Sequence, residues 1–232
     1  MRKACLSIPL IALALAACGS DTRELAPVDE DQPTSKAPDD ISVEGEEFRI
    51  LAFGNSLFAG YNLAEHEGYP ERLEQALRTD GLNARVIDAG VSGDTSAAGR
   101  QRLSFVLDRQ EVTPDLVLLE LGGNDMLRAI EPADTRANFE AMLQELEHRD
   151  IPVLLMGMRA PPNYGPDFQR EFDSIYGDLA REYEVDLVPF WLESIYQSPD
   201  LFQSDRIHPT AAGIERLVDD TKDDVRAALP AS

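Results

Sequence analysis

The sequence RILAFGNSLFAGYNL, Arg49 to Leu63, joins an apolar run to a glycine and a serine. The apolar run from Ile50 to Phe53 is typical of a buried strand, and the glycine that follows it marks a turn. The turn places a serine, Ser56, beside an amide, Asn55, directly after the strand. A hydroxyl in this place is either a helix cap or a candidate nucleophile, and the rest of the chain has to decide between the two.

The same pattern recurs along the chain. Short apolar runs alternate with longer segments of helical period, which predicts βαβ units around a parallel sheet. The predicted strands are Phe48–Phe53, Ala84–Ile87, Leu116–Leu121, Val153–Met158 and Val185–Phe190. The clearest predicted helices are Pro70–Gly81, Pro132–Arg149 and Pro209–Leu229. The sequence therefore predicts one α/β domain over residues 48–232, with no internal repeat and no second folded domain.

Residues 1–17 are predicted to be a secretory signal. Arg2 and Lys3 precede an apolar stretch, Ile8 to Ala17, that is too short to span a bilayer. The end of this stretch, LAAC, resembles the bacterial lipobox, which predicts cleavage before Cys18 and a lipid on its thiol. An ordinary signal with an incidental cysteine is the alternative. Because Cys5 lies in the signal, the mature chain would keep one cysteine and form no intramolecular disulfide.

Residues 18–47 are predicted to be the lipidated cysteine and a disordered acidic tether, because they hold few large apolar side chains. The expected product is an exported bacterial lipoprotein that faces the periplasm. Gly19 and Ser20 lack an aspartate at the second position, which favours the outer membrane. The chain has a formal net charge of −22. Such a surface repels phosphate backbones, so nucleic acid is not an expected partner.

Four polar or glycine-rich segments are expected at the ends of elements, where ligands bind in parallel α/β sheets. They are GNSL (54–57), DAGVSGDTSAAG (88–99), LGGNDM (121–126) and SDRIHPT (204–210). A serine needs a base to take its proton, and the chain has three histidines. His208 follows Asp205 by three residues, so that carboxylate can orient its ring. His66 and His148 have charged neighbours and are expected on the surface.

Acyl transfer also needs hydrogen-bond donors for the developing oxyanion. Gly93 can offer a backbone N–H, Asn124 a side-chain amide, and Ser56 its own N–H. Each motif alone has a simpler interpretation, in which these residues close turns or cap helices. Their joint placement at one predicted edge of the sheet favours a catalytic site.

With these four segments the chain resembles the GDSL or SGNH hydrolases, from about Phe48 to the final helix. The resemblance implies an α/β fold, a three-layer α/β/α sandwich with a parallel five-stranded flavodoxin-like sheet. It implies Ser56, Asp205 and His208 as catalytic residues, with Ser56, Gly93 and Asn124 binding the oxyanion. It implies no cofactor and no metal, and no Cys and His cluster in the sequence suggests one.

Within that family the chain looks most like the bacterial multifunctional thioesterases, lysophospholipases and arylesterases. The strings that carry this likeness are VSGDTSAAG, LELGGND, NYGPDF and LVPFWLESIY. The implied function is a serine esterase acting on small acyl esters or lysolipids, with no obligate protein partner. The alternatives are a catalytically silent binding protein of the same fold and a polysaccharide deacetylase. Apolar residues that could line an acyl pocket are Met126, Leu127, Ile130, Phe190, Trp191, Leu192, Ile195 and Tyr196.

The departure from the family is Asn55, where an aspartate is usual. An amide has nearly the shape of a carboxylate and keeps an acceptor oxygen, but it loses the charge and gains a donor. Since Asp205 already supplies the acid that orients the base, we expect Asn55 to replace the carboxylate with only a modest loss of activity.

Overall fold

The computed structural model describes residues 41–231. The strands are β1 (Phe48–Gly54), β2 (Ala84–Gly90), β3 (Leu116–Glu120), β4 (Val153–Met156) and β5 (Asp186–Val188). The α-helices are α1 (Tyr69–Thr79), α2 (Ser96–Asp108), α3 (Gly123–Leu127), α4 (Pro132–His148), α5 (Pro166–Glu182) and α6 (Ala211–Ala228). Short 3₁₀ turns cover η2 (Glu65–Glu67), η3 (Pro162–Tyr164) and η4 (Pro199–Leu201).

The five strands form one parallel sheet in the order β2-β1-β3-β4-β5. The chain first adds β2 on one side of β1 and then continues with β3 on the other side. Between β1 and β3 the direction of winding therefore reverses, and ligands bind at such a switch point in open α/β sheets. Gly54 at the end of β1 is in register with Gly90 on β2 and Glu120 on β3, so the loops that follow these strands leave at the same edge.

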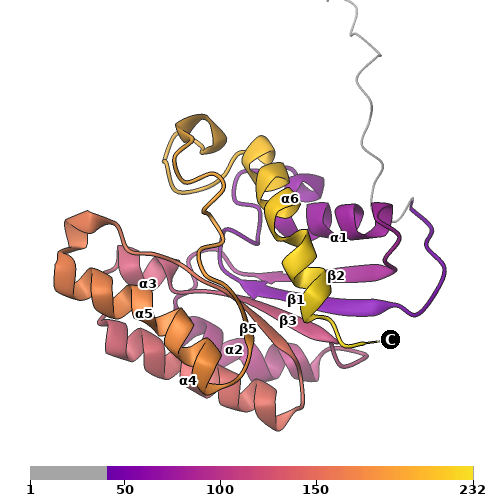
Figure 1. Cartoon of the computed structure of the whole chain (residues 1–232), viewed down its shortest axis with the longest axis horizontal. Coiled ribbons are helices and arrows are strands. Elements are labelled where there is room, and N and C mark those ends of the chain that lie inside the picture. Colours follow the sequence, from indigo (N-terminus) through magenta and orange to yellow (C-terminus); the bar gives the residue numbers. More distant parts are fainter. Residues whose placement is uncertain (1–40, 232) are drawn as a thin grey trace, which may run out of the picture. The chain divides into compact units, whose positions relative to one another are not determined.

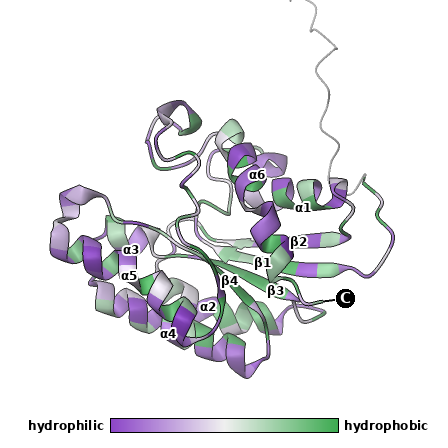
Figure 2. Ribbon diagram, viewed as in Figure 1, coloured by the Kyte–Doolittle hydropathy of each residue, from purple (hydrophilic) through white to green (hydrophobic). Residues whose placement is uncertain are grey.

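Helices cover both faces of the sheet, which gives the three layers that were predicted. Figure 1 shows α1 and α6 on one face and α2, α4 and α5 on the other. Figure 2 shows the apolar residues concentrated in the strands and the polar residues on the outward sides of the helices. Ile50 to Phe53 of β1 and all of β3 are buried, as expected of parallel strands packed on both faces.

The predicted strands are all present, with shifted ends. β2 continues past Ile87 to Gly90, because its backbone keeps pairing with β1 through Asp88 and Ala89. That polar ending has no strand-like composition, so the sequence signal stops early. β4 and β5 end before Met158 and Phe190, where the backbone turns toward the pocket described below.

The chain approaches β1 along the edge where the strands begin. The carbonyl of Ile41 accepts hydrogen bonds from Arg78 Nε at 2.9 Å and Nη2 at 2.6 Å. The carbonyl of Gly45 accepts one from Asn83 Nδ2 at 2.9 Å, just before β2. Residues 41–47, assigned from the sequence to the tether, are thus held against the domain by side chains distant in sequence. The predicted signal, Cys18 and the tether as far as residue 40 lie outside the described residues.

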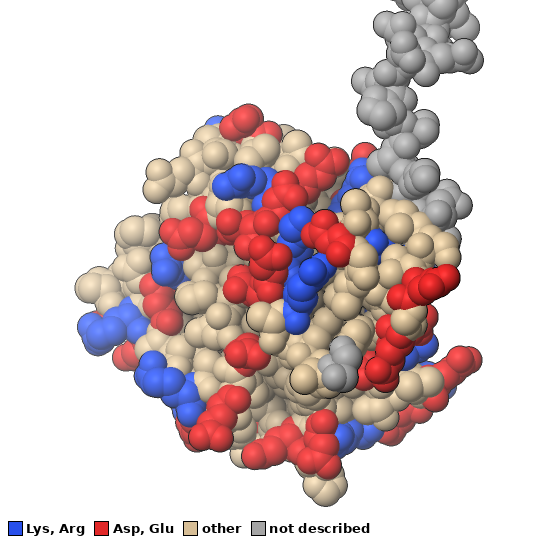
Figure 3. Space-filling model, turned by 45° about the vertical axis from the view of Figure 1, so that its right-hand side comes forward, with Lys and Arg blue, Asp and Glu red and all other residues tan. Residues whose placement is uncertain are grey.

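The surface carries the excess of acid seen in the composition. Figure 3 shows acidic side chains in several clusters across the visible face, with Arg and Lys side chains beside many of them. Within residues 41–231, no helix is both long and apolar enough to cross a membrane.

Candidate active site

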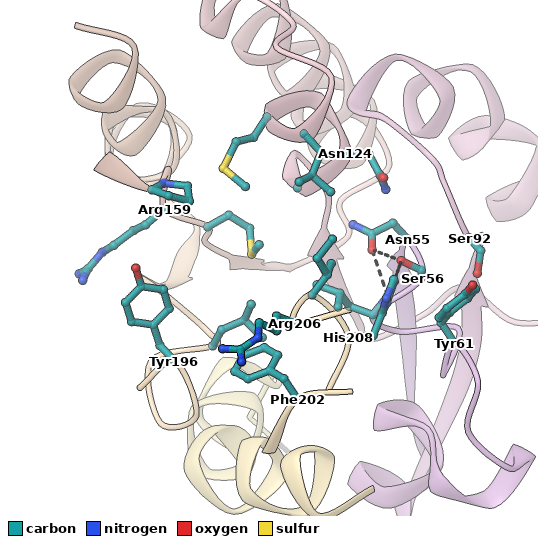
Figure 4. Close-up of a pocket in the computed structure, with 18 of the residues that line it drawn as sticks. Asn55, Ser56, Tyr61, Ser92, Asn124, Arg159, Tyr196, Phe202, Arg206 and His208 are labelled. Atoms are coloured by element: carbon teal, nitrogen blue, oxygen red, sulfur yellow. Dashed lines mark hydrogen bonds between the residues drawn. The ribbon is translucent and has the colours of Figure 1, made fainter. Parts of the chain in front are cut away.

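A pocket of about 470 Å³ lies at the carboxyl edge of the sheet, over the switch point (Figure 4). All four polar segments predicted from the sequence contribute to it. The lining residues are Asn55, Ser56, Leu57, Tyr61, Ser92, Gly93, Gly123, Asn124, Met126, Leu127, Met158, Arg159, Pro161, Phe190, Leu192, Tyr196, Pro199, Phe202, Arg206, Ile207 and His208. The apolar side chains come mainly from α3 and the segments after β4 and β5.

Ser56, His208 and Asp205 form one hydrogen-bonded row at the pocket wall. Ser56 Oγ lies 2.8 Å from His208 Nε2. His208 Nδ1 lies 2.7 Å from Asp205 Oδ2. Ser56 is buried and His208 half-buried, whereas Asp205 is exposed to solvent. The row has the geometry in which a carboxylate orients an imidazole and the imidazole accepts a proton from a hydroxyl.

A tight turn before α6 holds His208, the candidate base. Asp205 Oδ1 accepts hydrogen bonds from the N–H groups of Ile207, at 2.9 Å, and His208, at 3.1 Å. The Tyr61 ring lies against the His208 ring, with 4.3 Å between the centroids. Thr210 then caps α6 by accepting from Gly213 N. The Asp205 side chain therefore builds the turn with one oxygen and orients the histidine with the other.

The protonation of this row follows from its hydrogen bonds. Burial alone would raise the pKa of Asp205, but bonds from the His208 ring and from the N–H groups of Ile207 and His208 outweigh it and lower that pKa to about 2. Asp205 is thus ionised near neutral pH, and His208 donates to it from Nδ1. The other ring nitrogen, Nε2, is then free to accept the proton of Ser56.

Asn55 links Ser56, the candidate nucleophile, to a buried carboxylate on β3. Its Nδ2 donates to Glu120 Oε1 at 2.9 Å, and its backbone N–H donates to Glu120 Oε2 at 3.2 Å. Its Oδ1 accepts from Leu57 N at 3.0 Å and lies 3.4 Å from Ser56 Oγ. Burial raises the pKa of Glu120 to about 7, and the bonds from Asn55 offset this only in part. An amide suits position 55 because it can donate to Glu120 and accept from the turn at the same time.

Three candidate donors belong to residues that line the same pocket: Ser56, Gly93 and Asn124. In the described part of the chain, the N–H groups of Ser56 and Gly93 donate no hydrogen bond to a protein atom. Gly93 has φ +87°, which few side chains adopt, and its carbonyl accepts from Arg128 Nη2 at 2.8 Å. Asn124 Nδ2 donates one hydrogen to the carbonyl of Asp94 at 2.9 Å and keeps a second. These groups can stabilise an oxyanion.

Asp125, the residue after Asn124, anchors this part of α3 in the interior. Asp125 is fully buried and accepts from the N–H of Ser96 at 2.7 Å and its hydroxyl at 2.5 Å. Thr135 Oγ1 adds a third bond at 3.3 Å. The contact joins α3 to the start of α2 and α4. This contact could not be predicted from the sequence, because nothing in LGGNDM marks which of its polar side chains points inward.

The structure confirms some of the other sequence predictions and shows others to be wrong. His66 and His148 are exposed and do not line the pocket, as expected. Of the predicted acyl-pocket residues, Met126, Leu127, Phe190, Leu192 and Tyr196 line it. Three do not: Trp191 and Ile195 are buried in the core, and Ile130 lies outside the lining. Other lining residues were not predicted from the sequence, because most of them lie in loops with no periodic signal: Tyr61, Met158, Arg159, Phe202, Arg206 and Ile207.

A model of the GDSL-like lipase/acylhydrolase family matches residues 52–216. The chain belongs to this family. It is 39% identical to esterase TesA of Pseudomonas aeruginosa over 170 residues, which cover 73% of this chain and 84% of TesA. It is 38% identical to thioesterase 1/protease 1/lysophospholipase L1 of Escherichia coli over 160 residues, 69% of this chain and 74% of that protein.

Solved structures agree with this membership of the GDSL-like lipase/acylhydrolase family. AlinE4, described as an SGNH-hydrolase family esterase, is 58% identical and superposes with a TM-score of 0.69 over 81% of this chain and all of AlinE4. The crystal structure of TesA is 36% identical, with a TM-score of 0.72 over 79% of this chain and all of that structure. The resemblance predicted from the sequence is confirmed. The chain is a hydrolase, and its relatives support ester hydrolysis as its reaction.

Proposed function

We propose that the chain is a serine esterase that cleaves carboxylic esters through an acyl-enzyme on Ser56. The observation that carries the proposal is the hydrogen-bonded row, with 2.8 Å from Ser56 Oγ to His208 Nε2 and 2.7 Å from His208 Nδ1 to Asp205 Oδ2. A serine, an imidazole and a carboxylate in this order are the groups that nucleophilic acyl transfer requires.

In the first step, Ser56 Oγ attacks the ester carbonyl carbon while His208 Nε2 takes its proton. Asp205 stabilises the imidazolium that forms and stays ionised. The negative charge that develops on the carbonyl oxygen is met by the N–H groups of Ser56 and Gly93 and by the Asn124 amide. The C–O bond to the alcohol then breaks, and His208 returns the proton to the leaving oxygen.

In the second step, water attacks the acyl-enzyme. His208 Nε2 takes a proton from the water, and the same three donors hold the second oxyanion. When this intermediate collapses, Ser56 Oγ leaves and regains its proton from His208. The products are a carboxylic acid and an alcohol, and no group beyond these side chains and water is needed for the balance.

The pocket favours an apolar acyl chain. Met126, Leu127, Met158, Phe190 and Leu192 offer apolar surface beside the nucleophile. This composition suits aryl esters and acyl esters of short to medium length better than an acetylated sugar, which would need polar partners. Lysophospholipids and thioesters carry the same acyl group and are expected as further substrates, in line with the names of the relatives.

We also propose export and a lipid anchor at Cys18, from the signal and the LAAC sequence. The expected mature protein begins at Cys18 and fractionates with membranes, and a Cys18→Ala variant is released into the soluble fraction. Mass spectrometry of the N-terminal peptide tests this: an unmodified N-terminus cleaved elsewhere would contradict the anchor.

The deciding experiment is fluorophosphonate labelling of a soluble form that starts after Cys18. We expect the label on Ser56, together with hydrolysis of p-nitrophenyl butyrate and octanoate, and loss of both in Ser56→Ala. Ser92→Ala is the matched control, because Ser92 lines the same pocket without a histidine partner among the described residues and should still allow labelling. A folded protein that takes no label would instead indicate a binding protein of this fold.

A further inference from the structure

The charge of the pocket runs against the charge of the chain. Asp and Glu make up 43 of the 232 residues, and the formal net charge is −22. Within the described part of the chain no acidic side chain lines the pocket, whereas Arg159 and Arg206 do. The acidic surface as a whole repels anionic ligands. An arginine in the pocket wall would counteract this repulsion locally and favour the binding of an anionic group there.

Arg206 is held in the pocket wall at some cost. It lies between the two triad residues of the last segment, with φ +59°, in the left-handed region that side chains other than Gly and Asn seldom adopt. That conformation costs a non-glycine residue about 1 kcal/mol or more. The turn enforces it, because Arg206 N donates to the carbonyl of Gln203 at 2.9 Å. A glycine would fit this backbone without strain, so Arg206→Gly removes the side chain without a backbone penalty.

The guanidinium of Arg206 is uncommitted. Across residues 41–231 it makes no ion pair and no hydrogen bond, and the residue is exposed. Two other arginines at or next to the pocket already have partners. Arg159 pairs with Glu193 at 3.1 Å, and Arg128 donates to the Gly93 carbonyl. Figure 4 shows the Arg206 guanidinium directed away from His208, toward the part of the pocket where Tyr196 lies.

We propose that Arg206 forms an anion subsite of the pocket and makes the enzyme selective for esters that carry a carboxylate or phosphate at a distance from the ester bond. The proposal rests on the esterase function proposed above. Guanidinium groups bind both anions through paired, charge-assisted N–H bonds. Because the guanidinium is directed away from the base, the anion it binds is separated from the reacting carbonyl and leaves the triad undisturbed.

The anionic group has two possible positions in the substrate, and matched esters separate them. For the acyl side, the pair is mono-p-nitrophenyl glutarate, which ends in a carboxylate, and p-nitrophenyl pentanoate, which has the same number of carbons and no charge. For the alcohol side, the pair is 1-octanoylglycerol 3-phosphate and 1-octanoylglycerol. The measured quantity is the ratio of kcat/KM for the anionic ester to that for the neutral ester of each pair.

We expect one of the two ratios to fall about tenfold to a hundredfold in Arg206→Gln, the range for losing a hydrogen bond to a charged group. Arg206→Lys should keep most of the preference. Arg206→Gly relieves the backbone, so a ratio that falls equally in Arg206→Gln and Arg206→Gly assigns the effect to the charge. Arg216→Gln is the matched control, since Arg216 is an exposed arginine outside the pocket lining and its loss changes the net charge equally.

The inference is overturned if both ratios are unchanged in Arg206→Gln, or if they fall as far in Arg216→Gln. This failure is distinguishable from a failure of the esterase function. If the neutral esters are cleaved and cleavage depends on Ser56, the function stands and only the subsite is lost. If no ester is cleaved in a Ser56-dependent way, the function itself is wrong.

Discussion

The two sides of the candidate active site, which hold the proposed nucleophile and the proposed base, are built in opposite ways. The nucleophile side is buried: Ser56 follows a central strand, and its neighbour Asn55 is fixed by Glu120, 65 residues away on β3. The base side is exposed and local: Asp205 and His208 are three residues apart, and Asp205 organises its own turn. One side is positioned by tertiary structure and the other by a short motif, so substitutions on the two sides should fail differently.

The largest effect is expected on the local side. In Asp205→Asn the amide oxygen can still close the turn, but the amide nitrogen faces His208 Nδ1 and forces the wrong tautomer. We expect kcat to fall on the order of 10³–10⁴-fold, against about 10⁴–10⁶-fold for His208→Ala. The free energy of unfolding should fall by no more than about 1 kcal/mol, because the Asp205–His208 contact is exposed to solvent. Steady-state kinetics with p-nitrophenyl butyrate and urea unfolding measure the two quantities. A fall in kcat of less than tenfold would remove Asp205 from the triad.

The next effect tests the oxyanion donors. Asn124→Ala should lower kcat by about 10²–10³-fold with KM nearly unchanged, because the amide acts on the charge that develops in the transition state. Asn138→Ala is the control, because Asn138 Nδ2 donates to Ser96 Oγ at 3.0 Å but Asn138 does not line the pocket. An equal loss in both variants would mean that the network under α3, rather than the Asn124 amide, is responsible.

On the buried side, the next expected effect is a pH dependence of the free energy of unfolding. Glu120 has a pKa of about 7 in the folded chain, raised by burial from an ordinary value of 4.5. Between these two values the folded state therefore binds more protons than the unfolded state. The contribution of Glu120 to the free energy of unfolding is fully present below pH 4.5 and is lost as pH rises through about 7. The loss amounts to about 3 kcal/mol. Urea unfolding at pH 5 and pH 8 should show a smaller fall in Glu120→Gln than in the wild type. A part of the fall remains in the variant, because burial also raises the pKa of Glu71 to about 7.

The smallest change in rate is expected at Asn55. Asn55→Asp puts two carboxylates against each other at the place of a 2.9 Å hydrogen bond, so they would share one proton. We expect a rate within about tenfold of wild type and a less stable protein above pH 7. The double variant Asn55→Asp/Glu120→Gln reverses donor and acceptor and should recover the stability. A large rate gain in Asn55→Asp would show that a charge at this position tunes the triad.

The same contrast explains what the sequence could predict. The five strands, the two covered faces and the local motif at Asp205 and His208 follow from hydrophobic period and short spacing. The pairing of Asn55 with Glu120 does not, because Glu120 looks like an ordinary end of an apolar run until the register with Gly54 is known. Asp125 and Arg206 share this property, since a buried or pocket-facing role depends on loop geometry that leaves no periodic pattern.

The bonds from Arg78 and Asn83 to the carbonyls of Ile41 and Gly45 fix where the chain enters the domain. This entry lies at the edge where the strands begin, and the pocket lies at the edge where they end. If the residues before Ile41 held the domain to a membrane, the point of attachment would therefore lie at the edge of the sheet opposite the pocket. Dissolved esters could then approach the pocket without passing the point of attachment.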